Sequence, residues 1–521
     1  MELLRRNIHM DGREKDEKIR ITLEDDMNLP ETKPDVGMLC MERGIVVTEE
    51  IRPMAGAVSV KGRLVFSVLY HTQEDGGRLA CVEGKIPFEE TIRMDNASPE
   101  DSISVIGKVE DLTIGMINSR KLSVQALILL CAEAEELYDE AVTIGIAGEE
   151  SENGDVQFRR IPVEAAQIAM SRKDVLRVRE EMQLPSACPN IGSILWKSAE
   201  PGEMNFRLGE EKLSLQGEIV VFILYEPEGN GSPQIYETTV NIGTEFAAAG
   251  CRDKMVPDVR YEVAQCEFAV RPDEDGEPRC LGLEMSVELR ICVYEQLTVD
   301  LITDIYGVTR EISGIRKEAG LMRLLRSVTG RAKVAEHVAA EAGEHIASLV
   351  RSEGIAFPEE AEVRANGILL RGYLGIRILY VTGEEERPYG RLRTDIPFEY
   401  FLEIPGMSEE MKPGRIQTVL EQMTVTMLDE EELDIKAILS FSTTALCPFR
   451  AEMIGEVTEE ALDENKMRSL PGMVIYVVKQ GDNLWNIGKR YYVPVQRLLQ
   501  FNHLEGQEIT PGQKLLIVKG A

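Results

Sequence analysis

The sequence is poor in the residues and motifs that most catalytic sites require. It contains five histidines in 521 residues, and no Cys-x-x-Cys pair occurs among its nine cysteines. It also lacks the Gly-x-x-x-x-Gly-Lys-Ser/Thr and Gly-x-Gly-x-x-Gly patterns of nucleotide binding, the Gly-x-Ser-x-Gly of hydrolases and the His-Glu-x-x-His of metalloproteases. We therefore expect no catalytic residue, no metal site and no cofactor, and we expect the protein not to be an enzyme.

Basic residues and long apolar runs are also scarce. The chain has 58 Lys and Arg against 90 Asp and Glu, a net charge of −32. Such a surface repels nucleic-acid phosphates and anionic lipids, so nucleic acid is not expected as a partner. No stretch reaches the ~18 uninterrupted apolar residues of a membrane span, and no apolar run follows the N-terminal arginines as in an export signal. We expect a protein that stays in the cytoplasm of the cell that makes it, with reduced thiols.

One pattern of thirteen residues is present three times. The copies span residues 58–70, 213–225 and 368–380, so they lie 155 residues apart, and each has a glycine at its fifth position. Every second residue is apolar or Gly, which predicts a half-buried β-strand. A glycine inside such a strand typically marks a β-bulge or the close approach of another backbone. We therefore predict three repeats that contain the same distorted strand.

Each repeat continues on both sides of this strand. Pro30 and Pro34 of the first copy correspond to Pro185 and Pro189 of the second, and an alternating segment closes each repeat near residues 122–128, 283–291 and 433–441. Short alternating segments separated by turns are typical of antiparallel sandwiches and partly open barrels. The expected fold class is mainly β with some helix, with three sandwich- or barrel-like repeats.

Two segments before the third copy of the strand are predicted to be helical. The first, around residues 315–338, is a candidate linker between the second and third repeats. It has helical spacing of the apolar residues Leu321, Leu324, Leu325 and Val328. Residues 343–348 follow a run rich in Ala and Glu, which favours helix.

Acidic segments divide the chain. They lie at residues 148–155 and 456–471, and the second ends in Pro-Gly. The predicted parts are a first repeat at 1–147, a second at 156–312, a third at 313–455, a linker at 456–472 and a small module at 473–521. The constant spacing and the acidic linkers predict that the repeats are autonomous domains.

The C-terminal module has the pattern strand, helix, helix, strand. Asp482 or Asn483 can cap the first helix, whose apolar stripe is Leu484, Ile487 and Tyr491. Pro494 is suited to the first turn of the second helix.

This module resembles a LysM domain, through its Gly-Asp-x-Leu element at 481–484 and its Pro-Gly-Gln-x-Leu element at 511–515. The resemblance implies a βααβ fold whose groove, between the loop at residues 481–484 and the loop near residues 502–513, binds N-acetylglucosamine polymers such as peptidoglycan. The sequence departs from the family where Asn483 replaces the usual Thr and Gly488 the usual Ala. The implied ligand- or partner-binding residues of the groove and its edge are Gly481, Asp482, Asn483, Leu484, Trp485, Asn502, Pro511, Gly512 and Gln513.

The three repeats resemble the SPOCS domains of spore-coat proteins in endospore-forming bacteria, through their Pro-x-x-x-Pro lead and their Gly…Leu-Tyr strand. Three such domains followed by one LysM module is the arrangement of coat morphogenetic proteins. The resemblance implies a scaffold in the mother-cell cytoplasm, at the surface of the developing forespore. It also implies that the LysM module binds the coat-basement morphogenetic ATPase and connects it to other coat proteins, which competes with the peptidoglycan interpretation.

Two features of the module leave alternatives open. Trp485, one of two tryptophans, lies about 100° round the helix from the apolar stripe, so it either covers the core or anchors a partner. The module has six Lys and Arg against three acidic residues, a net charge of +3. A basic tip on an acidic chain suits an acidic partner, an anionic wall polymer or contact with its own repeats.

Overall fold

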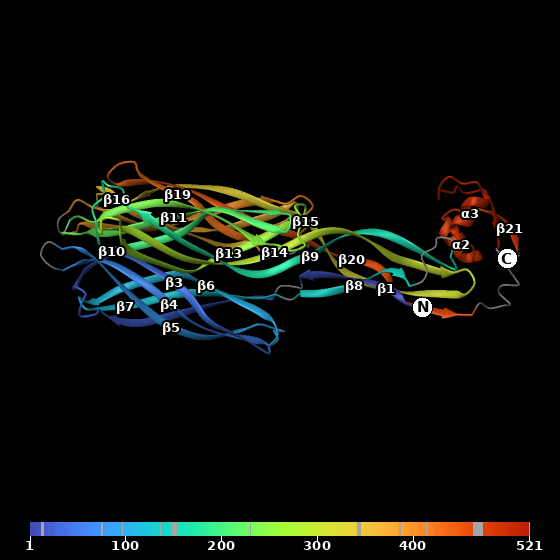
Figure 1. Cartoon of the computed structure of the whole chain (residues 1–521), viewed down its shortest axis with the longest axis horizontal. Helices are drawn as coiled ribbons and strands as arrows, with labels where there is room; N and C mark the ends of the chain where they lie inside the picture. Colours follow the sequence, from blue (N-terminus) through green and yellow to red (C-terminus); the bar gives the residue numbers. More distant parts are fainter. Residues whose placement is uncertain are drawn as a thin grey trace.

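The structure is a computed structural model of the chain. It describes residues 1–11, 15–73, 77–95, 97–135, 137–147, 154–229, 231–340, 345–384, 387–409, 411, 415–461 and 472–519. The predicted fold class is confirmed, because the repeats are built of antiparallel strands and the described helices lie in the C-terminal module. Figure 1 shows the repeats side by side at one end, the module at the other end, and long strands joining the two as a stalk.

Each repeat contains two three-stranded antiparallel sheets, and the repeated strand is the centre of one of them. The strands of the first repeat are β2 (Lys15–Asn28), β3 (Val36–Met54), β4 (Ala57–Thr72), β5 (Leu79–Arg93), β6 (Ser102–Asn118) and β7 (Lys121–Glu135). Those of the second are β9 (Val156–Gln183), β10 (Ile191–Gly209), β11 (Lys212–Pro227), β12 (Gln234–Ala247), β13 (Val256–Pro272) and β14 (Pro278–Gly307). Those of the third are β15 (Glu311–Ala339), β16 (Ser348–Arg364), β17 (Gly367–Val381), β18 (Tyr389–Glu403), β19 (Gln417–Met427) and β20 (Glu432–Glu460).

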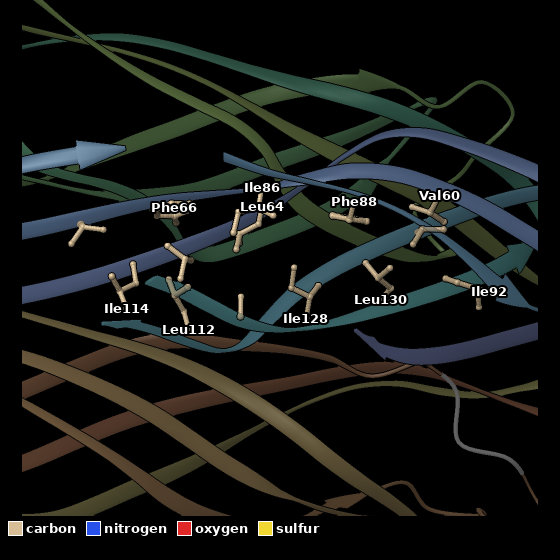
Figure 2. Close-up of a cluster of buried hydrophobic side chains, with 14 of the residues drawn as sticks. Val60, Leu64, Phe66, Ile86, Phe88, Ile92, Leu112, Ile114, Ile128 and Leu130 are labelled. Atoms are coloured by element: carbon tan, nitrogen blue, oxygen red, sulfur yellow. The ribbon is translucent and has the colours of Figure 1, made fainter. Parts of the chain in front are cut away.

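The two sheets of a repeat enclose its core. In the first repeat the orders are β3-β4-β5 and β2-β7-β6, and both middle strands alternate buried and more exposed residues. Figure 2 shows the apolar side chains of β4 and β5 facing those of β6 and β7 across this core. The equivalent cores of the other repeats are separate clusters, so each repeat is a sandwich with its own interior.

The tyrosine that ends the repeated strand connects it to the proline lead. The Tyr70 hydroxyl donates to the carbonyl oxygen of Pro34 at 2.9 Å, and the Tyr225 hydroxyl donates to that of Pro189 at 3.0 Å. Both rings are fully buried. The two elements therefore occur together because the carbonyl of the proline accepts a hydrogen bond from the buried hydroxyl of the tyrosine.

The strand glycines face a β-bulge, as predicted. The register of the neighbouring edge strand shifts between Thr48 and Glu50, between Pro201 and Met204, and between Pro358 and Glu360. A Cβ at Gly62 would lie 2.6 Å from the Val47 carbonyl oxygen, and one at Gly217 would lie 3.0 Å from that of Glu203. A Cβ at Gly372 would meet the Phe357 carbonyl oxygen. The glycine leaves space for the carbonyl that the bulge turns inward.

Replacing Gly217 by valine should destabilise the protein by about 1–3 kcal/mol, because the added atoms overlap the Glu203 carbonyl and the Met204 side chain. Urea denaturation of the full chain measures this change. Gly243→Val is the matched control, since a Cβ there comes no closer than 4.0 Å to a neighbour. Equal unfolding midpoints for the two variants would show that the bulge does not require the glycine.

The stalk is formed by one two-stranded ribbon from each repeat. The first pairs β1 (Leu3–Asp11) with β8 (Leu137–Ile146). The others are the first part of β9 with the end of β14, and the first part of β15 with the end of β20. The ribbons share clusters of buried side chains, which include Ile8, Leu301 and Leu321.

The helical linker predicted around residues 315–338 is wrong, because this segment lies in strand β15, which pairs with β20 along its length. Leu321 belongs to the stalk cluster, whereas Leu325 and Val328 pack on the core of the third repeat. The register shifts between Leu324 and Arg326, where the strand passes from stalk to sandwich. The extra residue of a bulge shifts the alternation of buried and exposed positions by one. The spacings of four and three residues, from Leu321 to Leu325 and from Leu325 to Val328, therefore imitate those of a helix. Residues 345–348 are not helical either, while 343–344 and most of the predicted linkers, 148–153 and 462–471, lie outside the described residues.

Equivalent residues of the three repeats meet in one buried cluster. Leu69, Leu224 and Leu379, the leucines of the three Leu-Tyr pairs, are at most 2% exposed and belong to this cluster. Each repeat therefore has its own core but also shares buried surface with the other two.

A buried charged group lies between the repeats. Glu353 of the third repeat accepts hydrogen bonds from Trp196 Nε1 of the second at 3.0 Å and from Arg351 Nε at 3.4 Å. Arg43 of the first repeat lies 3.8 Å from the same carboxylate, and Arg351 stacks on the Phe222 ring, 4.1 Å from its centroid. One carboxylate thus connects all three repeats.

Candidate binding site in the C-terminal module

The module has the predicted βααβ order. Its elements are β21 (Met473–Val477), α2 (Leu484–Tyr491), α3 (Val495–Phe501) and β22 (Lys514–Val518). Leu484 and Ile487 are each 1% exposed and pack with the buried residues of both strands. The apolar stripe of the first helix therefore forms the core, and the Leu484 side chain is enclosed in it.

The first predicted loop is held by its own side chains. Asp482 accepts hydrogen bonds from the Tyr476 hydroxyl at 2.6 Å and from the Lys479 backbone N–H at 2.8 Å, and these two donors lower the pKa of its carboxyl. Asn483 caps α2 by accepting from the Asn486 backbone N–H at 2.8 Å. Gly481 has a φ of +87°, which favours glycine at this turn.

The second predicted loop lies beside the first. The Val478 N–H donates to the Gln513 carbonyl oxygen, and the Gly512 N–H donates to the Val478 carbonyl oxygen. Pro511 and Gly512 form the turn between them, and Gln513 Oε1 accepts from the Thr510 backbone N–H. The structure thus places residues 512 and 513 next to Val478, three residues before the loop at 481–484.

Asn502 lies elsewhere, on the outer edge of β22. Its Nδ2 donates to the Leu516 carbonyl oxygen at 2.8 Å, and its Oδ1 accepts from the Leu516 N–H at 2.6 Å. Its Nδ2 also lies 2.9 Å from the Leu498 carbonyl oxygen. These bonds join helix α3 to strand β22.

Trp485 connects the module to the stalk. Its Nε1 donates to Asp304 Oδ2 at 2.7 Å, and its ring meets Tyr306 edge-on with centroids 4.9 Å apart. Lys489 Nζ donates to Asp304 Oδ1 at 2.5 Å. Burial raises the pKa of Asp304, but the bonds from Lys489 and Trp485 outweigh it and hold the pKa below its usual value. The tip therefore contacts its own repeats, one of the alternatives that the charge pattern left open.

Two further contacts complete this docking. The Tyr306 hydroxyl donates to the Val493 carbonyl oxygen at 2.9 Å, and the Tyr492 hydroxyl donates to Glu311 Oε2 at 2.6 Å. A Cβ at Gly488 would lie 2.6 Å from the Tyr306 hydroxyl and 2.7 Å from the Val493 carbonyl oxygen. Both the docking and the module's own backbone therefore favour a glycine where LysM domains usually have alanine. Asp304, Tyr306 and Glu311 were not predicted as site residues. The feature of the sequence that pointed to this contact was the opposite net charge of the C-terminal module and the rest of the chain.

Replacing Asp304 by alanine should loosen this docking, because the Trp485 indole N–H and the Lys489 ammonium lose their shared acceptor. In a Trp196→Phe background, the emission of Trp485 should shift to the red and become more accessible to a soluble quencher. Asp300→Ala is the control, since Asp300 is exposed on the same strand. An unchanged Trp485 spectrum would mean that the apolar contact with Tyr306 is sufficient.

No metal centre or membrane helix is found in the part of the chain that the structure describes. There, no group of three or more His, Cys, Asp or Glu side chains is placed to hold a metal ion. Likewise, no described helix is long and apolar enough to cross a membrane.

Comparison with known families finds two kinds of domain. The SPOCS domain of SipL matches residues 35–117, 190–271 and 345–428, and the LysM domain matches residues 476–518. Both are binding domains, and no catalytic domain is detected. The uncharacterised protein YkzQ of Bacillus subtilis (strain 168) is 33% identical over 72 residues, which cover 12% of this chain and 96% of YkzQ. No solved structure matches the chain.

These matches confirm both resemblances. Each SPOCS match contains one copy of the repeated strand, and the LysM match covers the docked βααβ module from residue 476, within β21, to the end of β22. SPOCS domains imply a role in spore coat morphogenesis, and a LysM domain implies peptidoglycan binding. The chain belongs to the family of SipL-like spore proteins, in which SPOCS domains, here three, precede a C-terminal LysM domain.

Proposed function

We propose that the protein is a non-enzymatic scaffold of endospore coat assembly, whose LysM module links coat layers to the coat-basement morphogenetic ATPase at the forespore surface. The proposal places it on the mother-cell side of that surface. The observation that carries it is the docking of the module on the stalk. Asp304, Tyr306 and Glu311 hold one side of the module, at the end of the molecule opposite the repeats (Figure 1). Such an arrangement suits a rigid spacer that presents a binding module at its tip.

The internal bonds of the predicted groove favour a protein partner over a glycan. Asp482, Asn483, Asn502 and Gln513 each have side-chain atoms bonded within the module. A sugar polymer is recognised largely through polar groups that meet its hydroxyl and amide groups, and these side chains are engaged elsewhere. We propose that the loops at 481–484 and 511–513 form the edge of a protein interface.

The second candidate function is peptidoglycan binding at the cell wall or cortex. The LysM match supports it, as does the net charge of +3 on the module, which suits an anionic wall polymer. The two functions are compatible with the same fold and differ in the partner that the module binds.

One experiment with two arms distinguishes them. In the first arm, the purified full chain is tested for binding to the purified coat-basement ATPase by biolayer interferometry at two salt concentrations. In the second arm, the same protein is sedimented with purified peptidoglycan. We expect binding to the ATPase that weakens at high salt, and no co-sedimentation above that of an unrelated acidic protein. Co-sedimentation without ATPase binding would replace the scaffold proposal by the glycan function.

A further inference from the structure

The outer face of strand β21 exposes apolar side chains. Met473 is 64% exposed, Ile475 69% and Val477 49%, and among the described residues no other large apolar side chain is as exposed as the first two. Their cross-strand neighbours include Leu516 and Val518, which are partly exposed on the same face. This surface remains uncovered although α2 packs against the stalk.

The edge of β21 is also open. The Lys519 N–H donates to the Gly472 carbonyl oxygen, and the Val478 N–H donates to that of Gln513, which fixes the phase of pairing with β22. In an antiparallel pair, hydrogen-bonded and non-hydrogen-bonded positions alternate, so the N–H and C=O groups at 473, 475 and 477 point away from β22. In the described part of the chain, β21 has no other strand partner.

The opposite edge of this sheet is closed. The same phase turns the Leu516 backbone groups outward from β22, and there the Asn502 amide both donates to and accepts from them. Proteins normally protect edge strands with charge, proline or a cover, but β21 (Met-Val-Ile-Tyr-Val) carries no charge and no proline. The module thus closes one edge and leaves the other accessible.

The position of β21 permits a partner to approach. In Figure 1, α2 lies on the side of the module next to the stalk strands and β21 on the far side. A strand added to β21 would therefore not disturb the contacts of Trp485 and Lys489 with Asp304.

The charges near β21 indicate which partner fits. Lys479 follows the strand, and Lys514 is paired with Val477; both are exposed. A second copy of the chain would bring together two basic tips, and it would bring together two chains that each have a net charge of −32; both pairs of like charges repel. An acidic segment meets the lysines favourably.

We propose that β21 binds an extended segment of a partner protein, which adds to the sheet as a third strand. Its backbone pairs with residues 473, 475 and 477, and the apolar side chains on one of its faces cover Ile475. Acidic side chains at the end of the segment beside Val477 meet Lys479 and Lys514. Main-chain pairing supplies the affinity, and the alternating side chains supply the specificity. This inference rests on the proposed function in one respect, that the module binds protein.

The test uses the full chain and a ten-residue peptide that has Glu at both ends and alternating Val and Thr between them. We expect the peptide to bind and to slow amide hydrogen exchange at Ile475 and Val477. It should bind at least tenfold more weakly when the peptide amides that face β21 are N-methylated. Ile475→Glu should reduce binding at least tenfold. Ile355→Glu, at an isoleucine that is 48% exposed in the third repeat, should not reduce it. No exchange protection at β21, or equal affinity of the methylated peptide, would overturn the inference.

Two further measurements separate the remaining cases. Concentration-dependent dimerisation in sedimentation velocity that Ile475→Glu abolishes would assign the edge to a second copy and overturn the inference. If the coat-basement ATPase bound wild type and Ile475→Glu with equal affinity, the proposed function would be supported. The inference that β21 takes part in ATPase binding would be overturned. If the peptide bound at β21 and the ATPase did not bind, the inference that β21 adds a partner strand would be supported. The ATPase would then be rejected as the partner.

Discussion

Replacing Glu353 by alanine should lower the stability of the repeats by about 3–5 kcal/mol, the usual effect of removing one partner of a buried ion pair. The carboxylate is buried where the three repeats meet. Its loss leaves Arg351 and Arg43 with Glu200 as their shared carboxylate, and it leaves Trp196 Nε1 without a hydrogen bond. Urea denaturation followed by circular dichroism measures the change. Glu362→Ala is the control, because Glu362 forms exposed ion pairs and its loss should leave the midpoint nearly unchanged.

The Glu353 carboxylate should also make the stability of the protein depend on pH. Burial raises the pKa of Glu353, but Arg43, Arg351 and the Trp196 hydrogen bond together hold it below the usual 4.5. Because the folded-state pKa is lowered, the contribution of Glu353 is complete above pH 4.5 and is lost as the pH falls through the folded-state pKa. The stability difference between wild type and Glu353→Ala should therefore shrink below pH 4.5. A difference that is constant between pH 7 and 3 would show that the carboxylate acts through packing alone.

Truncating Leu224 to alanine should cost about 2–5 kcal/mol, as for a fully buried leucine, although the side chain lies outside the core of its own repeat. The cavity would open between repeats, next to Trp196. In a Trp485→Phe background, the emission of Trp196 should therefore shift to the red. Urea denaturation and this spectrum are the two measurements.

The control for Leu224 is an apolar residue of similar size on the surface. Ile355 is 48% exposed, and its replacement by alanine should change stability by no more than about 0.5 kcal/mol. Leu69→Ala and Leu379→Ala, at the equivalent positions, should behave like Leu224→Ala. If all three leucine variants matched the control, the repeats would not stabilise each other through this cluster.

Much of the architecture could be predicted from the sequence. The alternation around Gly62, Gly217 and Gly372 predicted the strands, and the glycines predicted the bulges, because both effects depend on neighbours along one strand and its direct partner. The two loop elements of the module predicted its βααβ order for the same reason, since its caps and turns are local. In β15 the local pattern gave a wrong result, because the bulge after Leu324 made a strand resemble a helix.

The sequence alone determined the three repeats, their strands, the terminal module and the basic tip on an acidic body. Only the tertiary structure decided that Leu69, Leu224 and Leu379 share one cluster, that Glu353 connects three repeats, and that Trp485 contacts Asp304. The physical reason is distance along the chain: Trp485 and Asp304 are 181 residues apart, and Trp196 and Glu353 are 157 apart. Periodicity shows which face of a strand is buried but not what covers it, and the covering element is selected by packing and by the pairing of buried charges.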